Sequence, residues 1–304
     1  MATRCTAFIL LLFALYQKSY SQLSAQDSVL PYLHGVRTPD ALTLNVRGYE
    51  IFVEEAAGDF SKPYFSKMFP RFGLRQGYKS VRDSSFDQAA FRAEQAHTKG
   101  KRDSAHTVFY FFQKAPGRVL GIAIGGPRAV DEDFQHAVAR TLLTVEIPDT
   151  LIAPKPSPAT ELHFVGRTIP VGGRCNWMGP AVLQCPDFGE INWSLHPTEA
   201  EATEHLALQM QRNAAGSQFT MEEDEKVPVI LEGVEVEARR LQYRLKGVLG
   251  AVAKNAEGSR TLIVYYLTAP VRGRWVRFVG SHWTSDYLEP SGLPKLLDMV
   301  MRLK

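Results

Sequence analysis

The feature that most constrains the fold is a strand–turn–strand–helix pattern that occurs twice in this 304-residue chain. The later copy begins with Thr261–Leu267, a run rich in β-branched and aromatic residues. A turn at Ala269–Gly273 leads into a second strand, Arg274–Val279, in which neither face is purely polar. An apolar stripe over residues 293–301 then predicts a helix that ends the chain.

The earlier copy has the same order of elements. Val108–Phe112 and Val119–Ile124 read as strands joined by a turn at Lys114–Arg118, and both turns contain Ala-Pro followed by Gly-Arg. A helix follows over Val130–Val145, with Asp131 as its N-cap. The sequence therefore predicts an α+β protein with two similar halves of antiparallel sheet and helices packed on one face of each.

The second half also resembles a known architecture in its order of elements. Its block of strands closing in a helix is similar in outline to the α/β sandwich of the Mog1/PsbP type, found in Ran-binding proteins and an oxygen-evolving subunit of photosystem II. The resemblance implies a sheet with helices against it, and it transfers no residue, activity or partner to this chain.

The N-terminus carries the most specific targeting signal in the chain. Arg4 precedes an apolar run, Cys5–Tyr16, and Ser19–Ser21 is a small-residue cleavage site before Gln22, which together predict a secretory signal peptide. A helix of this length reaches only about 18 Å, short of a bilayer core of about 30 Å. Uncleaved anchoring and a buried N-terminal helix are the alternatives. We expect an exported protein, periplasmic or extracellular, cleaved near Ser21.

Proline content suggests where the halves divide. Residues 22–39 read as an extended lead-in and residues 40–150 as the N-terminal half. Residues 151–160 contain three prolines and are the best candidate for a stiff linker, which places the C-terminal half at residues 161–304.

Two cysteines remain after cleavage, Cys175 and Cys185. Export exposes a chain to an oxidising compartment, where an even pair usually closes a disulfide. A redox pair normally has two intervening residues, and a zinc site would need two further ligands. A structural disulfide is therefore the prediction.

Charge argues against two classes of partner. Cleavage of residues 1–21 removes Arg4 and Lys18 and no acid, leaving 33 basic side chains against 32 acidic ones. Nucleic acid and anionic membranes require a clustered basic patch, and the sequence has no basic run. We therefore expect no nucleic-acid partner. No stretch after residue 21 approaches the ~20 apolar residues of a membrane span, so we also expect no transmembrane segment in the mature chain.

Other segments carry local signals of secondary structure. In the first half we expect a strand over Leu42–Glu54 with a turn or bulge at Gly48, a short core-filling helix within Phe60–Leu74, and an amphipathic helix over Ser85–Thr98. In the second half the expected strands cover residues 162–171, 190–196, 219–221, 227–231 and 234–245. The acidic run at residues 222–225 reads as a solvated turn, and a helix is expected from Thr198 to about Ala215.

Motifs for catalysis are absent from the sequence. It contains no H-E-x-x-H, G-x-S-x-G, P-loop or G-x-G-x-x-G motif in a suitable context. His196, Glu201 and His205 form the best candidate metal set, because Glu201 and His205 share one helix face. The alternative assigns Glu201 to a capping box with Thr198.

Two further clusters could carry chemistry. The segment Ser281–Asp286 holds hydroxyls, an imidazole and a carboxylate, but adjacent strand residues point to opposite faces, so it reads as a loop rather than a triad. Asn192–Ser194 matches the N-glycosylation pattern on a predicted strand.

These signals favour an exported soluble protein that is a non-catalytic binding or envelope-associated domain, with no cofactor and with a protein or envelope component as partner. The alternative is a secreted hydrolase or metal-dependent enzyme with a dispersed site. A pocket holding two or more of His136, His163, His196, His205 and His282 with a carboxylate would favour the enzyme, whereas a flat apolar patch around Trp177 and Met178 would favour binding.

Overall fold

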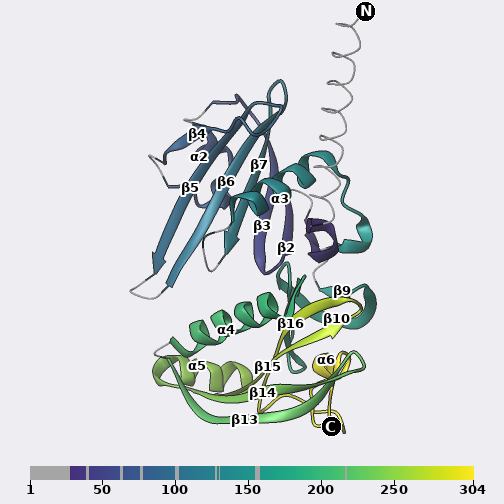
Figure 1. The fold of residues 1–304 in the computed structure, drawn as a ribbon. Coiled ribbons are helices and arrows are strands. Elements are labelled where there is room, and N and C mark those ends of the chain that lie inside the picture. Colours follow the sequence, from purple (N-terminus) through teal and green to yellow (C-terminus); the bar gives the residue numbers. More distant parts are fainter. Residues whose placement is uncertain are drawn as a thin grey trace, which may run out of the picture.

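A computed structural model describes residues 28–38, 41–61, 64–75, 78–99, 103–126, 129, 131–154, 158–215 and 218–304. The predicted signal peptide, residues 1–21, lies outside these ranges. Two large sheets dominate the fold, one in each half of the chain, and Figure 1 shows them one above the other. The predicted mixed α+β class with two similar halves is confirmed.

The first sheet has eight strands among the described residues, in the order β4-β5-β6-β7-β3-β2-β1-β8. All neighbouring strands pair antiparallel except β8, which runs parallel to β1. The strands are β1 (Leu33–Arg37), β2 (Ala41–Val46), β3 (Tyr49–Ala57), β4 (Ser80–Arg82), β5 (Ala90–Lys99), β6 (Asp103–Ala115), β7 (Arg118–Gly126) and β8 (Ile152–Pro154).

Both faces of this sheet are buried because β6 is apolar on both sides. Tyr110 and Phe112 face the core beneath helix α3 (Glu132–Thr144), whose Asp131 cap accepts a hydrogen bond from the Phe134 N–H. Phe109 and Phe111 face the opposite core, which is filled from α2 (Phe65–Met68) and a 3₁₀ turn, Pro70–Phe72. The core-filling role predicted for the aromatic segment is confirmed.

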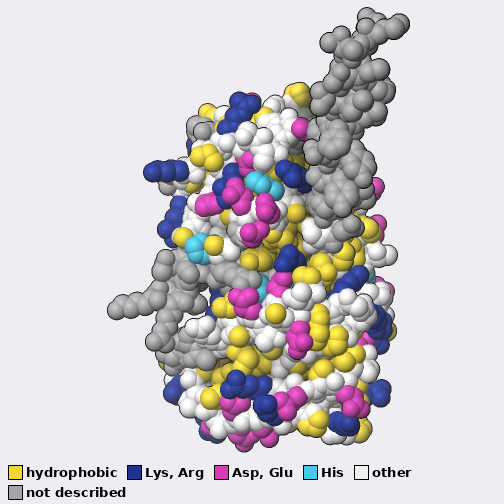
Figure 2. All heavy atoms as spheres, in the orientation of Figure 1, with side chains coloured by type: hydrophobic (Ala, Val, Ile, Leu, Met, Phe, Trp, Pro, Cys, Tyr) yellow, Lys and Arg dark blue, Asp and Glu magenta, His cyan; other side chains and the backbone are white. Residues whose placement is uncertain are grey.

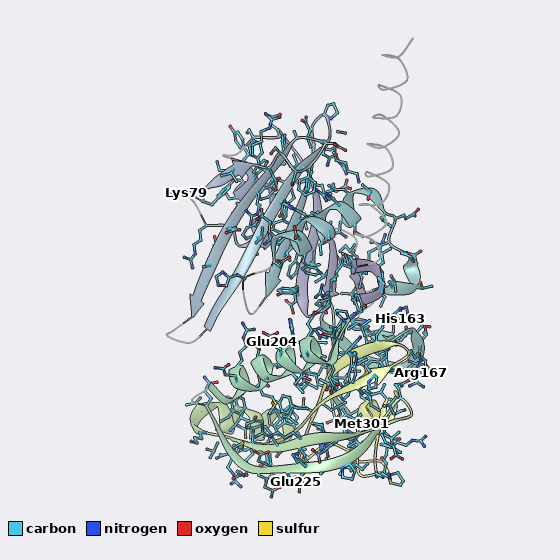
Figure 3. The ribbon with its side chains drawn as sticks, viewed as in Figure 1. Lys79, His163, Arg167, Glu204, Glu225 and Met301 are labelled. Atoms are coloured by element: carbon cyan, nitrogen blue, oxygen red, sulfur yellow. A yellow bond between two sulfur atoms is a disulfide. The ribbon has the colours of Figure 1, made fainter. Side chains whose placement is uncertain are left out.

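The second sheet has nine strands among the described residues, in the order β17-β13-β14-β15-β16-β12-β11-β10-β9. Helix α4 (Glu199–Ala215) contacts β12, β15 and β16 and lies on the side toward the first half, where Figure 3 labels its Glu204. The remaining elements are β9 (Ala159–Phe164), β10 (Arg167–Gly179), β11 (Val182–Cys185), β12 (Gly189–His196), β13 (Phe219–Leu231), β14 (Val234–Leu245), α5 (Gly247–Glu257), β15 (Thr261–Val271), β16 (Arg274–Trp283), α6 (Lys295–Asp298) and β17 (Met301–Leu303).

Three hairpin turns in the structure can be compared with the predictions. Arg47 and Gly48 take positive φ between β2 and β3, so Gly48 marks a turn rather than a bulge. A single strand over residues 162–171 is wrong, because Val165 and Gly166 form a turn between β9 and β10. The turn predicted at Ala269–Gly273 is shorter in the structure: β15 continues to Val271, and only Arg272 and Gly273 form the turn.

The helix predicted over Ser85–Thr98 is wrong. Most of this segment is strand β5, which pairs with β6 so that Phe91 lies opposite Phe111 and Ala93 opposite Phe109. The alanines of this segment fit the period of a helix as well as the period of a strand. The segment forms a strand because it supplies the hydrogen-bonding partner for one edge of β6. Tertiary pairing therefore overrides helix propensity here.

The long closing helix is also wrong. Only residues 295–298 are helical, and residues 301–303 form β17, which pairs with β13. The predicted apolar stripe is nevertheless buried, since Leu293, Leu296, Leu297, Val300 and Met301 are all at most 4% exposed. The prediction that these side chains are buried is confirmed, but the prediction that they lie on one continuous helix is wrong.

The acidic run at residues 222–225 is not a turn, because β13 is continuous through it. Arginines on β14 lie opposite these acids: Arg239 pairs with Asp224, Arg240 with Glu223 and Glu225, and Arg244 with Glu222. Figure 3 labels Glu225 on this outer strand. Cross-strand charge pairing accounts for a strand that is polar on its solvent face.

Cys175 and Cys185 form the predicted disulfide, with an S–S distance of 1.97 Å. Trp177 in the same hairpin is only 5% exposed and its ring centroid lies 6.1 Å from that of Trp193, whereas Met178 is 62% exposed. The flat apolar patch predicted around Trp177 and Met178 is therefore not formed, because the Trp177 ring faces the core. No helix in the described residues is long and apolar enough to cross a membrane.

Candidate functional site

The two halves meet where the β2–β3 turn reaches α4. Arg47 donates from Nε to Glu201 Oε1 at 2.8 Å, and its Nη2 contacts the other carboxylate oxygen. The Arg47 guanidinium carbon also lies 5.0 Å from the centroid of the Phe134 ring. A bidentate charge pair with an aromatic support fixes the turn against the helix.

Close backbone approach completes this contact. A Cβ added to Gly48 would lie 2.4 Å from Nδ1 of His205, well inside van der Waals distance. The Tyr49 ring meets the His205 ring edge-on with centroids 5.6 Å apart. Glycine at position 48 therefore serves both the turn and the junction between the halves.

The predicted metal set comes together in space, with one ligand atom from each of His196, Glu201 and His205 within 4.8 Å of the others. Both oxygens of Glu201 already contact the Arg47 guanidinium, so a metal ion would have to compete with that cation. Burial raises the pKa of Glu201, but hydrogen bonds from His196 and Arg47 outweigh it and bring the pKa to about 2.

A second arrangement here has the order of a catalytic triad. Ser194 Oγ lies 2.8 Å from His196 Nε2, and His196 Nδ1 lies 3.2 Å from Glu201 Oε1. Burial lowers the pKa of His196, so the neutral imidazole accepts from Ser194 and donates to Glu201 at pH 7. Ser194 and His196 are both 0% exposed, so a substrate cannot reach the Ser194 hydroxyl.

The other predicted histidines are dispersed. His136 contacts Asp83 at 3.2 Å, His163 lies 3.6 Å from Glu161, and His282 Nδ1 donates to the Trp283 carbonyl at 2.9 Å. Asp286 accepts a hydrogen bond from the Trp283 N–H at 3.1 Å, so its carboxylate stabilises the loop after β16. Within the described residues no hydrogen bond joins Ser281 to His282.

Both halves line a pocket with a volume of about 270 Å³, here called the junction pocket, which the sequence does not predict. Asn45, Gly48 and Glu50 come from the first half, while α4 and β16 contribute Gln209, Arg212, Asn213 and Arg277 from the second. It holds one histidine, His205, so it does not meet the two-histidine criterion for an enzyme.

Arg277 dominates the chemistry of this pocket. Its side chain is 7% exposed, and desolvation lowers its pKa to about 10, so it stays cationic at pH 7. Its Nε donates to Ser194 Oγ at 2.7 Å, and its two terminal nitrogens donate to the side-chain oxygens of Gln209 and Asn192. No carboxylate among the described residues lies within ion-pair distance of it.

Two further charges lie on the pocket walls. Glu50 and Arg212 both line it, and the charges of Arg277 and Arg212 partly offset the burial that raises the pKa of Glu50. The charged side chains that line the pocket are thus two guanidinium groups and one carboxylate, a set that favours an anion over a cation.

A signal for Arg277 was present in the sequence. It is the charged residue in Trp275–Val279, a strand segment otherwise made of apolar side chains. The glycosylation pattern at Asn192 falls in the same region, where the Asn192 amide oxygen accepts from Arg277 and Ser194 is fully buried. Arg277 and Asn192 therefore form a partly buried hydrogen bond with each other.

Comparisons with known proteins assign no family. No family model matches the chain, and no curated protein matches it. Among solved structures, the chain is similar to the crystal structure of DynU16, a protein in the dynemicin biosynthetic locus, at 11% identity over 89% of this chain and 85% of that one. The TM-score of 0.17 is too low to carry an argument about fold or function.

Proposed function

We propose that this chain is an exported, non-catalytic binding protein that takes a small anionic ligand into the pocket between its halves. The observation that carries the proposal is Arg277, a buried guanidinium that faces a pocket and has only neutral hydrogen-bond acceptors among the described residues. The predicted signal peptide and the disulfide between Cys175 and Cys185 support the export part of the proposal.

Burying a charged group costs free energy because it loses its contacts with water. A buried cation is stabilised when an opposite charge shares its environment, and none lies within ion-pair distance here. A guanidinium has five N–H groups, of which three have acceptors in the described structure. Two N–H groups therefore remain for a carboxylate, which arginine binds in a bidentate fashion.

Binding of simple anions tests this proposal. We expect acetate to bind the wild-type protein measurably in calorimetry and methylammonium not to bind. Arg277→Met should abolish acetate binding, and Arg212→Met, which changes an exposed residue of α4, should weaken it several-fold. Arg302→Met on β17, outside the pocket, should bind acetate like wild type.

Equal acetate binding by wild type and by both pocket variants would contradict the proposal. Circular dichroism and melting temperature establish whether Arg277→Met is folded. If that variant does not fold, the Arg212→Met and Arg302→Met comparison still decides the outcome.

A secreted hydrolase is the second candidate, and the Ser194–His196–Glu201 order is the observation that favours it. Such a triad requires the serine hydroxyl to reach a substrate, whereas Ser194 is buried and receives a hydrogen bond from Arg277. We expect a fluorophosphonate probe to leave Ser194 unlabelled. Stoichiometric labelling that Ser194→Ala abolishes would establish the hydrolase instead.

A further inference from the structure

A second, more apolar chamber adjoins the junction pocket. Its volume is about 230 Å³, and it shares the side chains of Asn192, Gln209 and Asn213 with the pocket that holds Arg277. Each space alone is smaller than the usual ligand pocket of roughly 300–1,000 Å³, and the two together fall within that range. A ligand that displaces the shared side chains of Gln209 and Asn192, which accept from Arg277, would extend from the polar pocket into the chamber.

The strands of the second sheet explain the change from polar to apolar. Alternate residues of a strand share a face, so Arg277, Val279 and Ser281 follow one another along β16 on the side of α4. Residues 277 and 281 are separated by about 14 Å along an extended strand. Val264 on β15 and Tyr243 on β14 widen the apolar floor.

The far end of the chamber has the opposite charge. Glu190 lines both the chamber and a neighbouring pocket, which also contains Asp187, Glu257 and Asp286. Burial raises the pKa of Glu190. A second anionic group on the ligand would meet these acids, so the site favours one negative charge, placed at Arg277.

We propose, on the basis of the proposed function above, that the ligand is an amphipathic monocarboxylate, bound through its carboxylate at Arg277 with its apolar tail in the chamber beneath α4. Figure 1 shows α4 on the side of the second half that faces the first half, above the strands that form the chamber floor. The ligand's carboxylate supplies the direct ion pair that no described residue makes with Arg277, since Glu50 acts on it only at longer range, and the tail lies against Val264 and Val279.

The test is calorimetric titration of the full mature chain with the straight-chain acids acetate, butanoate, hexanoate, octanoate and decanoate. We expect affinity to rise about fourfold for each added methylene until the chamber is filled, and then to level off. The alkanol and alkylammonium of the best chain length should bind at least about tenfold more weakly, since neither carries the carboxylate. The α,ω-diacid of that length should also bind more weakly, because its second carboxylate meets Glu190.

Two variants separate the chamber from the anion site. Leu262→Trp fills the chamber from β15, and Val279→Thr makes its floor polar with little change in shape. Both should bind acetate as wild type does and should lose most of the gain with chain length. Val248→Thr, at an exposed position on α5 outside the chamber, is the matched control and should keep that gain.

The outcomes distinguish the two proposals. If acetate binds through Arg277 but affinity does not rise with chain length, the monocarboxylate assignment is overturned and the anion site stands. If the gain persists unchanged in Leu262→Trp and Val279→Thr, the tail binds elsewhere and the assignment is equally overturned. If no carboxylate binds at all, the proposed function itself fails.

Discussion

Asp286 shows how one buried carboxyl ties stability to pH. It is 9% exposed, and burial, with Asp187 and Glu257 nearby, raises its pKa from 3.8 to about 6. The folded protein thus holds the Asp286 proton more tightly than the unfolded chain does. Its contribution to stability is fully present below about pH 4, falls as the pH rises to about 6, and stays lower above that.

Asp286→Asn should therefore stabilise the protein at neutral pH, because asparagine accepts from the Trp283 N–H without ionising. We expect the melting temperature to rise by about 2 °C at pH 7.5 and hardly at all at pH 4. Asp59→Asn, in an exposed loop, is the control for loss of charge. A gain that is the same at both pH values would refute this account of Asp286.

Single residues also mark the limit of prediction from sequence. The cap hydrogen bond of the predicted capping box is present, since the Glu201 N–H donates to Thr198 Oγ at 3.2 Å. The carboxylate, however, reaches Arg47, which lies 154 residues away in the chain. Local spacing predicted the cap and brought Glu201 and His205 to one face, but a partner from the other half cannot be read from local spacing.

At the scale of elements, the β2–β3 turn is the part of the first half that meets α4. Gly48 has φ of +82°, and a side chain there would strike His205. Gly233 has a similar φ of +87° in the β13–β14 turn, with nothing within 4 Å of an added Cβ. A side chain at either position would strain the backbone, and only one at position 48 would also strike a neighbour.

Gly48→Ala should cost about 1–3 kcal/mol more free energy of unfolding than Gly233→Ala, because it adds overpacking to the backbone strain. Urea unfolding of both variants measures the difference. We also expect acetate binding to weaken in Gly48→Ala, since Gly48 and His205 line the junction pocket. Equal losses of stability in the two variants would show that the contact with His205 is unimportant.

Elements were predicted well where the chain is apolar on a regular period, as in α3, α4 and the β6–β7 and β15–β16 hairpins. Errors fell at the edge strands of the sheets or next to them. Strands β5 and β17, and the acidic middle of β13, are strands because a neighbour supplies hydrogen bonds and opposite charges. Those partners are distant in sequence, so local periodicity does not specify them.

The two halves of the molecule meet through an apolar contact, in which Val36 and Ala153 join the core of the second half, and through a small charged contact beside the junction pocket. Charges of both signs are interspersed on the face shown in Figure 2, in keeping with the balanced composition. Arg47 and Glu201 are the charged contact, with side chains 28% and 13% exposed. Partial burial makes the pair stronger than one at the surface.

A double-mutant cycle with Arg47→Met and Glu201→Gln should give a coupling energy of about 1–3 kcal/mol. The pair formed by Arg239 and Asp224 is the matched control, because it is also bidentate but more exposed, at 48% and 34%. Its coupling should be below about 1 kcal/mol. Coupling in the Arg47 cycle no larger than in the control cycle would contradict a junction held by this contact.

We propose that Arg277 holds a small anion between the two halves, and native mass spectrometry of the protein tests this most directly. The account predicts one small acid bound per wild-type chain, either carried through purification or acquired from added decanoate, and lost in folded Arg277→Met. Adducts that are equally abundant in both proteins, or absent from wild type even with decanoate present, would contradict it.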